Sequence, residues 1–202
     1  FTGYVSKELK SHSGWTQEQA EAEVETYSAR PGTSEHQTGL CCDMHNLPGA
    51  DVSFANKEAY KWLGENAWKF GFILRFPEDK TEITGYSFEP WHYRYVGRYH
   101  AQKIHDGGLC LEEYLELLQK HTALNPLEFT TSDTKYTMYF VAAAPAGATG
   151  IDIGEEYSDS YAISGTACGG YAVSFSEPYS PPETTAESGA SAESGTGGGA
   201  ER

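Results

Sequence analysis

Apolar residues recur at helical spacing in residues 58–70 and lie on one helical face in residues 111–121, whereas residues 16–27 are rich in helix-forming residues. In residues 16–27, Thr16 is followed three residues later by Gln19, the pattern of a capping box at a helix start. In residues 58–70, the side chains expected to face a core are Tyr60, Leu63 and Trp68. We therefore predict a helix in each stretch.

Short apolar or alternating runs predict strands elsewhere. In the first half of the chain these runs are Phe1 to Tyr4, which resembles a buried strand, and residues 71–76 and 91–95, with a loop or hairpin over residues 77–90. After Pro126 the sequence pattern changes to short strand-like segments separated by Gly, Pro and Ser, at residues 136–141, 150–153, 161–164 and 170–175. Together with the helices, these runs predict an α+β protein.

These changes in sequence pattern and composition divide the chain into three predicted parts. Residues 1–124 form the main domain, residues 125–176 form a small β-rich appendage, and residues 177–202 form a disordered acidic tail rich in Ser and Gly. The tail has no aromatic residue after Tyr179, so it cannot bury enough apolar surface to offset the entropy lost on ordering. Because the chain starts at Phe1, we expect the natural N-terminus to be missing, together with any signal peptide.

Charge and composition exclude some classes of partner. The formal net charge is -15, from 29 Asp and Glu residues against 14 Lys and Arg residues. A protein that grips nucleic acid needs clustered positive charge, so nucleic acid is not an expected partner. No apolar run approaches the roughly 20 residues needed to cross a bilayer, so we expect no stable membrane insertion of this segment.

Two short motifs carry candidate chemistry. Residues 34–43, with the sequence SEHQTGLCCD, present His36 and Asp43, and residues 89–92, with the sequence EPWH, present Glu89 and His92. Two imidazoles and one carboxylate leave the fourth tetrahedral position open for water, which is the arrangement of a catalytic zinc site. On spacing alone, a satisfied structural histidine is the more common alternative for each imidazole. We predict that His36, Asp43 and His92 bind Zn²⁺ and that Glu89 is the general base.

Both motifs resemble the two signatures of the D-alanyl-D-alanine carboxypeptidase family that includes the VanY and VanX enzymes. SEHQTGLCCD is similar to the pattern S-x-H-x-x-G-x-A-x-D, and EPWHYRYVG is similar to the second signature. The resemblance spans about residues 1–120 and implies the same three ligands and the same base. It also implies a hedgehog-like fold, a small antiparallel sheet flanked by helices with zinc at the open face of the sheet.

The resemblance extends to substrate-binding residues. It implies that Ser34 lies near the terminal carboxylate of the substrate, although a turn-forming serine fits the spacing equally well. From its chemistry, Arg30 could pair bidentately with that carboxylate, and the alternative is a solvated surface arginine.

Three positions depart from the family pattern. Gly3-Tyr4 resembles the start of the family's Gly-Tyr-Arg-Ser, so Val5 stands where an arginine helps to hold the oxyanion, and Lys10 stands where the family has Gln. Losing an oxyanion donor can cost about 10² to 10³ in rate. Either Arg30, Lys10 or Arg94 substitutes for the missing donor, or the enzyme is slow, or its substrate differs. Cys41 replaces a small alanine and shares a strand face with Asp43, whereas Cys42 is expected to face the core.

These motifs lead to a functional hypothesis with two alternatives. The leading hypothesis is an extracytoplasmic, zinc-dependent D,D-carboxypeptidase that hydrolyses the terminal D-alanine of peptidoglycan stem peptides. An L,D-carboxypeptidase that acts on tetrapeptide stems shares the same motifs. A non-catalytic wall-binding zinc module is the alternative from another class, and Glu89 argues against it because a structural zinc needs no base.

Overall fold

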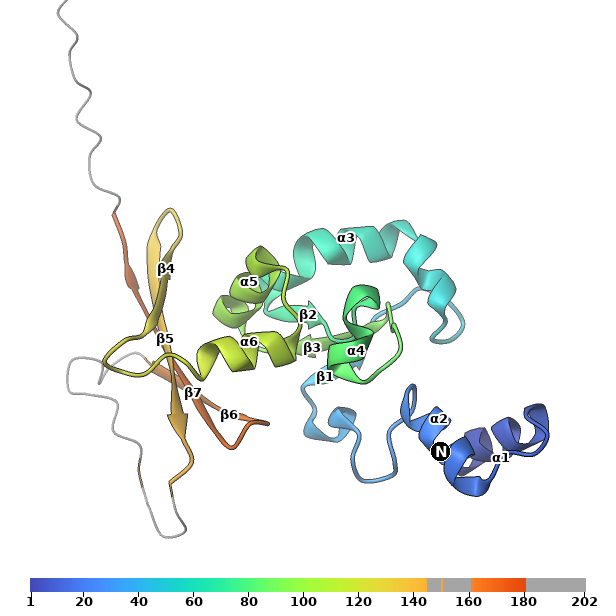
Figure 1. Cartoon of the computed structure of the whole chain (residues 1–202). Helices are drawn as coiled ribbons and strands as arrows, with labels where there is room; N and C mark the ends of the chain where they lie inside the picture. Colours follow the sequence, from blue (N-terminus) through green and yellow to red (C-terminus); the bar gives the residue numbers. More distant parts are fainter. Residues whose placement is uncertain (145–149, 151–160, 181–202) are drawn as a thin grey trace, which may run out of the picture.

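The computed structural model describes residues 1–144, 150 and 161–180, and Figure 1 shows their arrangement. The helices are α1 (Thr2–Ser11), α2 (Gln17–Glu25), α3 (Glu58–Asn66), α4 (Thr81–Thr84), α5 (Arg98–Gly107) and α6 (Leu111–Leu118). Short 3₁₀ turns are η1 (Glu35–Thr38), η2 (Val52–Asn56), η3 (Ala67–Phe70) and η4 (Glu78–Lys80). The strands are β1 (Cys41–Asp43), β2 (Phe72–Leu74), β3 (His92–Tyr95), β4 (Leu127–Thr130), β5 (Thr134–Ala142), β6 (Tyr161–Thr166) and β7 (Gly170–Pro178).

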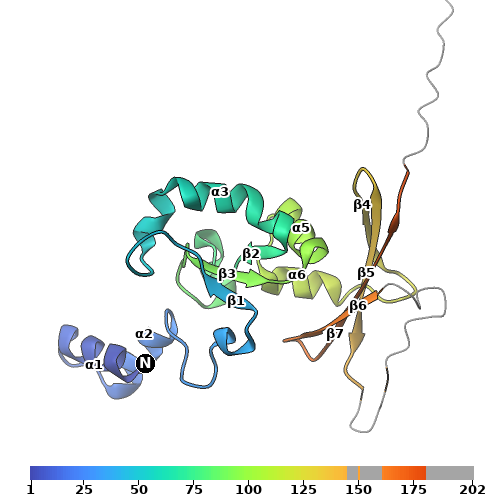
Figure 2. The ribbon, with the colours of Figure 1, turned by 180° about the vertical axis from the view of Figure 1, so that it is seen from behind.

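A small antiparallel sheet with the order β1-β3-β2 lies in the middle of the molecule (Figures 1 and 2). Asp43 lies opposite His92, and Cys41 lies opposite Arg94. Residues directly opposite each other in an antiparallel pair share a face of the sheet. The register therefore places Asp43 and His92 side by side on one face, and the mixed helix and antiparallel-sheet architecture predicted from the sequence is confirmed.

A second antiparallel sheet with the order β4-β5-β7-β6 stands at one end of the molecule, and α1 and α2 lie at the other end (Figures 1 and 2). Met138 of β5 and Ala172 of β7 belong to one buried cluster that also contains residues of β2, α5 and α6, namely Ile73, Ala101, Ile104, Tyr114 and Leu118. The β4–β7 sheet thus shares a hydrophobic core with the helices of the first part of the chain. The predicted division at residue 124 stays a prediction.

The first residues are helical, so the prediction of a buried strand at Phe1 to Tyr4 is wrong. Thr2 to Tyr4 belong to α1, and Phe1 is its N-cap. Tyr4 is 50% exposed, whereas Val5 is buried. Phe1, Val5 and Leu9 recur every four residues and pack against α2. This spacing matches the helical period, which four residues were too few to reveal.

The remaining helix predictions are largely confirmed. Helix α2 begins after Thr16, which makes the predicted capping box with Gln19. Residues 58–70 form α3 followed by η3, but the three expected core side chains, Tyr60, Leu63 and Trp68, are only partly buried. Helix α6 covers the first eight residues of the third predicted helix.

Most of the other predicted strands match, whereas several elements were not predicted. Strands β2, β3, β5, β6 and β7 overlap predicted runs, whereas α4, α5, η4 and β4 arose where loops or nothing had been expected. The predicted strand at residues 150–153 lies almost entirely outside the described residues, as does the tail after residue 180. Within the described part of the chain, no helix combines the length and apolarity that a membrane span requires.

Candidate metal centre

Three of the predicted site residues converge on one face of the β1-β3-β2 sheet. The 3₁₀ turn η1 carries His36, and Gly39 ends the turn in a left-handed conformation (φ 72°) that leads the chain into β1. Asp43 ends β1, and His92 begins β3 directly opposite. His36 Nε2 lies 3.4 Å from Asp43 Oδ1, and His92 Nδ1 lies 3.8 Å from the same oxygen.

The donor set and its spacing fit a divalent metal. One ligand atom from each of His36, Asp43 and His92 lies within 4.8 Å of the other two. Ligands held about 2.0 to 2.1 Å from a tetrahedral zinc are about 3.3 Å apart, close to the distances between these atoms. The side chains of His36 and Asp43 are 41% and 38% exposed, whereas His92 is buried. The cluster is therefore open to solvent on one side.

Glu89 lies beside this cluster. Its Oε2 is 3.2 Å from His92 Nδ1, the same ring nitrogen that faces Asp43. The EPWH segment is a turn in which the backbone N–H of His92 donates to the carbonyl of Glu89, and the N–H of Glu89 donates to Phe76. Glu89 is only 9% exposed, so the carboxylate is held next to the cluster rather than in bulk solvent.

Glu35 is a site residue that the sequence analysis missed. Its Oε1 accepts a hydrogen bond from His92 Nε2 at 2.8 Å, and its Oε2 accepts one from Arg94 at 2.6 Å. Arg75 approaches the same oxygen at 3.4 Å and pairs with Glu112 of α6 through both terminal nitrogens, at 2.6 and 3.1 Å. The only sequence signal was an acidic residue next to a candidate ligand, which is too common to be informative.

The contacts of Glu35 and His92 explain the shifted pKa values of both groups. Burial opposes the charge on Glu35, but the hydrogen bond from His92 and the positive charge of Arg75 outweigh it and lower the pKa of Glu35 to about 2. Burial likewise opposes the charge on His92, but the hydrogen bonds to Glu35 and Glu89 raise the pKa of His92 to about 9. The low pKa of Glu35 thus reflects the positive charge around it, and the high pKa of His92 reflects the two carboxylates that it contacts.

Comparison with known proteins identifies this part of the chain. The family model VanY, D-alanyl-D-alanine carboxypeptidase, matches residues 5–98. Residues 5–98, called the VanY-family domain below, are thus similar to this family. A D-alanyl-D-alanine carboxypeptidase of Enterococcus faecalis (strain ATCC 700802 / V583) is 60% identical over 102 residues, which are 50% of this chain and 37% of that protein. The chain thus aligns with well under half of that relative's length.

Two solved structures resemble the VanY-family domain and its surroundings. VanYB in complex with D-Alanine-D-Alanine is 53% identical, with a TM-score of 0.50 over 57% of this chain and 61% of that chain. The D,D-dipeptidase VanXYg, in complex with a D-Ala-D-Ala phosphinate analog, is 29% identical, with a TM-score of 0.66 over 87% of this chain and 68% of that chain. An alignment over 87% of the chain necessarily extends beyond residue 124.

The two predicted substrate-binding residues lie in different surroundings. Ser34 caps η1, where its hydroxyl accepts a hydrogen bond from the backbone of His36, so it stands immediately next to the metal cluster. Arg30 instead pairs with Glu21 and Glu25 of α2. The guanidinium of Arg30 is therefore already engaged by carboxylates outside the cluster, as the alternative of a surface arginine implies.

The expected loss of an oxyanion donor at Val5 does not concern the metal cluster. Val5 is buried with Ala20 and Val24 between α1 and α2, so it is a core residue of the helical pair. Lys10 lies exposed near the end of α1. Of the three cations considered as substitutes, Arg94 is the one that contacts the site, through Glu35.

Of the two cysteines in the first motif, one lies as predicted and the other does not. Cys41 lies close to Glu35 and His92 and shares the face of Asp43, as predicted. Burial and then the neighbouring Glu35 raise the pKa of the Cys41 thiol to about 12, so it stays protonated and unreactive. Cys42, on the edge strand β1, is exposed, so the prediction that it faces the core is wrong. All four cysteines have free thiols.

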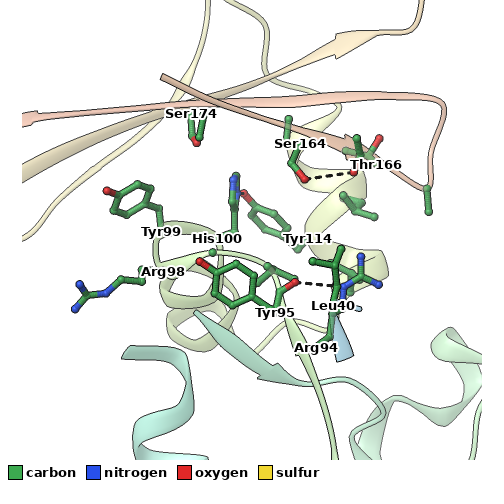
Figure 3. Close-up of a pocket in the computed structure, with 18 of the residues that line it drawn as sticks. Leu40, Arg94, Tyr95, Arg98, Tyr99, His100, Tyr114, Ser164, Thr166 and Ser174 are labelled. Carbon is green, nitrogen blue, oxygen red and sulfur yellow. Dashed lines mark hydrogen bonds between the residues drawn. The ribbon is translucent and has the colours of Figure 1, made fainter. Parts of the chain in front are cut away.

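A pocket of about 440 Å³ adjoins the VanY-family domain on the side of the β4–β7 sheet (Figure 3). Tyr95, Tyr99 and Arg94 line it from one side, and Ser164 and Ser174 of the β6–β7 hairpin face them. Glu35, whose Oε1 lies 2.8 Å from His92 Nε2, also lines the pocket.

Proposed function

We propose that the protein is a zinc-dependent D,D-carboxypeptidase that removes the terminal D-alanine from peptidoglycan stem peptides. The observation that carries the proposal is the convergence of His36, Asp43 and His92 with Glu89 beside them, inside a VanY-family domain. A closed structural zinc site takes four protein ligands, whereas this cluster offers three and is open to solvent.

His36, Asp43 and His92 would hold the zinc. A bound Zn²⁺ supplies Lewis acidity, which makes water a stronger acid and a peptide carbonyl a better electrophile. Two of the three ligand side chains lie near the surface, so a substrate can approach from the solvent side while His92 stays anchored in the sheet.

Glu89 would act as general base and then as general acid. Its carboxylate takes a proton from the attacking water, whose oxygen adds to the carbonyl carbon of the penultimate residue. The C–N bond to the terminal D-alanine then breaks, and Glu89 passes the proton to the leaving amine. The net reaction consumes one water and releases D-alanine and a shortened stem.

The choice of substrate rests on the relatives. The curated relative from Enterococcus faecalis is named D-alanyl-D-alanine carboxypeptidase, and the two solved structures hold D-Ala-D-Ala or its phosphinate analog. A phosphinate has the tetrahedral shape of the hydrolytic intermediate, which fits a hydrolase mechanism. Ser34, whose hydroxyl accepts from the backbone of His36 next to the cluster, would donate to the terminal carboxylate. Because stem peptides lie outside the cytoplasmic membrane, we propose an extracytoplasmic location.

The test is the release of D-alanine from a pentapeptide stem and from a tetrapeptide stem, each with added zinc and with a chelator. Zinc-dependent release from the pentapeptide alone supports the D,D-carboxypeptidase. Release from the tetrapeptide alone would show the L,D-specificity instead. Absence of release from both, with zinc bound, would contradict the enzyme proposal and favour a wall-binding module.

A matched pair of variants isolates the base. Glu89→Gln keeps the shape of the side chain but cannot accept a proton, so we expect the rate of D-alanine release to fall about 10² to 10⁴-fold while zinc binding is retained. Glu82→Gln, at an exposed glutamate of α4, should leave the rate unchanged. A Glu89→Gln rate within a few-fold of the unmodified protein would rule out the proposed role.

A further inference from the structure

The two ring nitrogens of His92 face different carboxylates. Nδ1 faces the metal cluster, 3.8 Å from Asp43 and 3.2 Å from Glu89. Nε2 faces the opposite way and lies 2.8 Å from Glu35 Oε1. A neutral imidazole carries one proton, and only the nitrogen without it can bind a metal. The carboxylate that bonds Nε2 therefore decides which nitrogen is free.

Glu35 is itself held in place from a second direction. Arg94 donates to its Oε2 at 2.6 Å, and Arg75 contacts the same oxygen at 3.4 Å. Arg75 is anchored in turn by a two-point pair with Glu112 of α6. Bidentate pairing of this kind restricts both position and orientation. The carboxylate of Glu35 is thus fixed to the body of the domain.

We infer that Glu35 is a positioning residue, which holds His92 in the tautomer with its proton on Nε2 and so presents the lone pair of Nδ1 to the metal. This inference rests on the proposed zinc site and adds a residue outside its three ligands and its base. Carboxylates that accept the second N–H of a ligating histidine typically contribute 10 to 100-fold to metal affinity.

Glu35 also couples the two histidines. It precedes His36 in η1, so one short turn supplies a candidate ligand and the residue that orients the other histidine. The rings of His36 and His92 are 4.6 Å apart. A displacement of η1 would therefore disturb both imidazoles together.

The alternative role for Glu35 is purely structural, as a charge partner of Arg75 and Arg94. The two roles differ in what the Glu35 variants change. Loss of a positioning residue weakens zinc binding and alters the tautomer of His92, whereas loss of a structural ion pair lowers stability without a selective effect on the metal. Glu21 provides a matched control, because it also pairs with an arginine, Arg30, and its side chain is 26% exposed compared with 20% for Glu35.

The experiment compares Glu35→Ala, Glu35→Gln and Glu21→Gln in the full chain. Zinc dissociation constants are measured by competition with a chromophoric chelator, and folding is checked by circular dichroism. We expect Glu35→Ala to weaken zinc binding 10 to 100-fold. Glu35→Gln, whose amide oxygen can still accept from Nε2, should recover part of this loss, and Glu21→Gln should change the dissociation constant less than about threefold.

Two further readouts test the mechanism. In ¹⁵N spectra of the zinc-loaded protein, His92 should show a protonated Nε2, and this signal should broaden or shift in Glu35→Gln but not in Glu21→Gln. At saturating zinc, kcat should fall in Glu35→Gln while KM stays unchanged, because Glu35 is not expected to touch the substrate.

The outcomes separate this inference from the proposed function. Zinc affinity and His92 spectra that are the same in Glu35→Gln and Glu21→Gln would overturn the positioning role, and Glu35→Gln decides the case if Glu35→Ala fails to fold. If the unmodified chain binds zinc but releases no D-alanine, the proposed function fails and the zinc affinities still test Glu35. If the unmodified chain binds no zinc, both are overturned.

Discussion

The two sheets of the molecule are built in opposite ways. Strands β1, β2 and β3 have three or four residues each, and one face of their sheet carries histidine, carboxylate and guanidinium groups that contact one another. Strands β5 and β7 have nine residues each and pair along their whole length. Met138 and Val173, on these strands, are completely buried.

The long sheet therefore contributes mainly to stability, whereas the short sheet carries the groups of the candidate metal site. Burial of apolar side chains is roughly additive and non-directional, so a long sheet with a hydrophobic core holds its shape without specific polar contacts. Ion pairs contribute little net stability but impose direction on the groups they join. We therefore expect substitutions in the two sheets to affect different quantities.

The largest expected effect is on metal binding. Asp43→Ala removes the only proposed anionic ligand, so we expect the zinc dissociation constant to rise by more than 100-fold, beyond the range typical of a residue that acts through a ligand. The thermal unfolding midpoint measured in chelator should change little, because Asp43 is 38% exposed. A large fall of that midpoint would show that the short sheet depends on Asp43 for its fold.

A substitution in the long sheet should lower stability and leave metal binding unchanged. Met138→Ala leaves a cavity between β5 and α6, where the Met138 sulfur also accepts a hydrogen bond from the Tyr114 hydroxyl. We expect a loss of about 2 to 5 kcal/mol in the free energy of unfolding, measured with urea. The zinc affinity of the folded variant should stay within about twofold, and a larger change would mean that the two sheets are energetically coupled at the metal site.

The smallest expected effect is a pH dependence that arises between the sheets, at His100 of α5. Burial lowers the pKa of His100 from 6.5 to about 4. The unfolded chain therefore binds a proton at His100 below about pH 6.5, whereas the folded protein resists protonation until about pH 4. Stability should fall as the pH falls through this window, by at most about 3 kcal/mol from this residue.

The check is urea unfolding at pH 7.5 and pH 4.5. His100→Gln cannot titrate but can still hydrogen-bond the hydroxyl of Tyr114, whose oxygen lies 2.6 Å from His100 Nδ1. Its stability should fall less than that of the unmodified protein over this range. An equal fall in both proteins would assign the pH dependence to other groups.

Sequence motifs allowed the proposed ligands and base to be predicted, but not Glu35, the residue that contacts His92 from behind the cluster. His36, Asp43, Glu89 and His92 stand in two short segments whose spacing is characteristic, and the structure brings their side chains together. Glu35 was missed because its partners lie 57 and 59 residues away, at His92 and Arg94. Contacts at such separations leave no local pattern.

The sequence by itself determined α2, α3 and α6, most of the strands, the capping box of α2 and the ligand types of the proposed zinc site. Periodicity and capping depend on hydrogen bonds and side-chain contacts within a few residues, so a single segment contains the information. Only the tertiary structure decided which ring nitrogen of His92 faces the metal cluster, that Val5 is a core residue and that β5 and β7 share a core with α5 and α6. Each of these depends on which distant segments pack together, and a local pattern does not specify the partner.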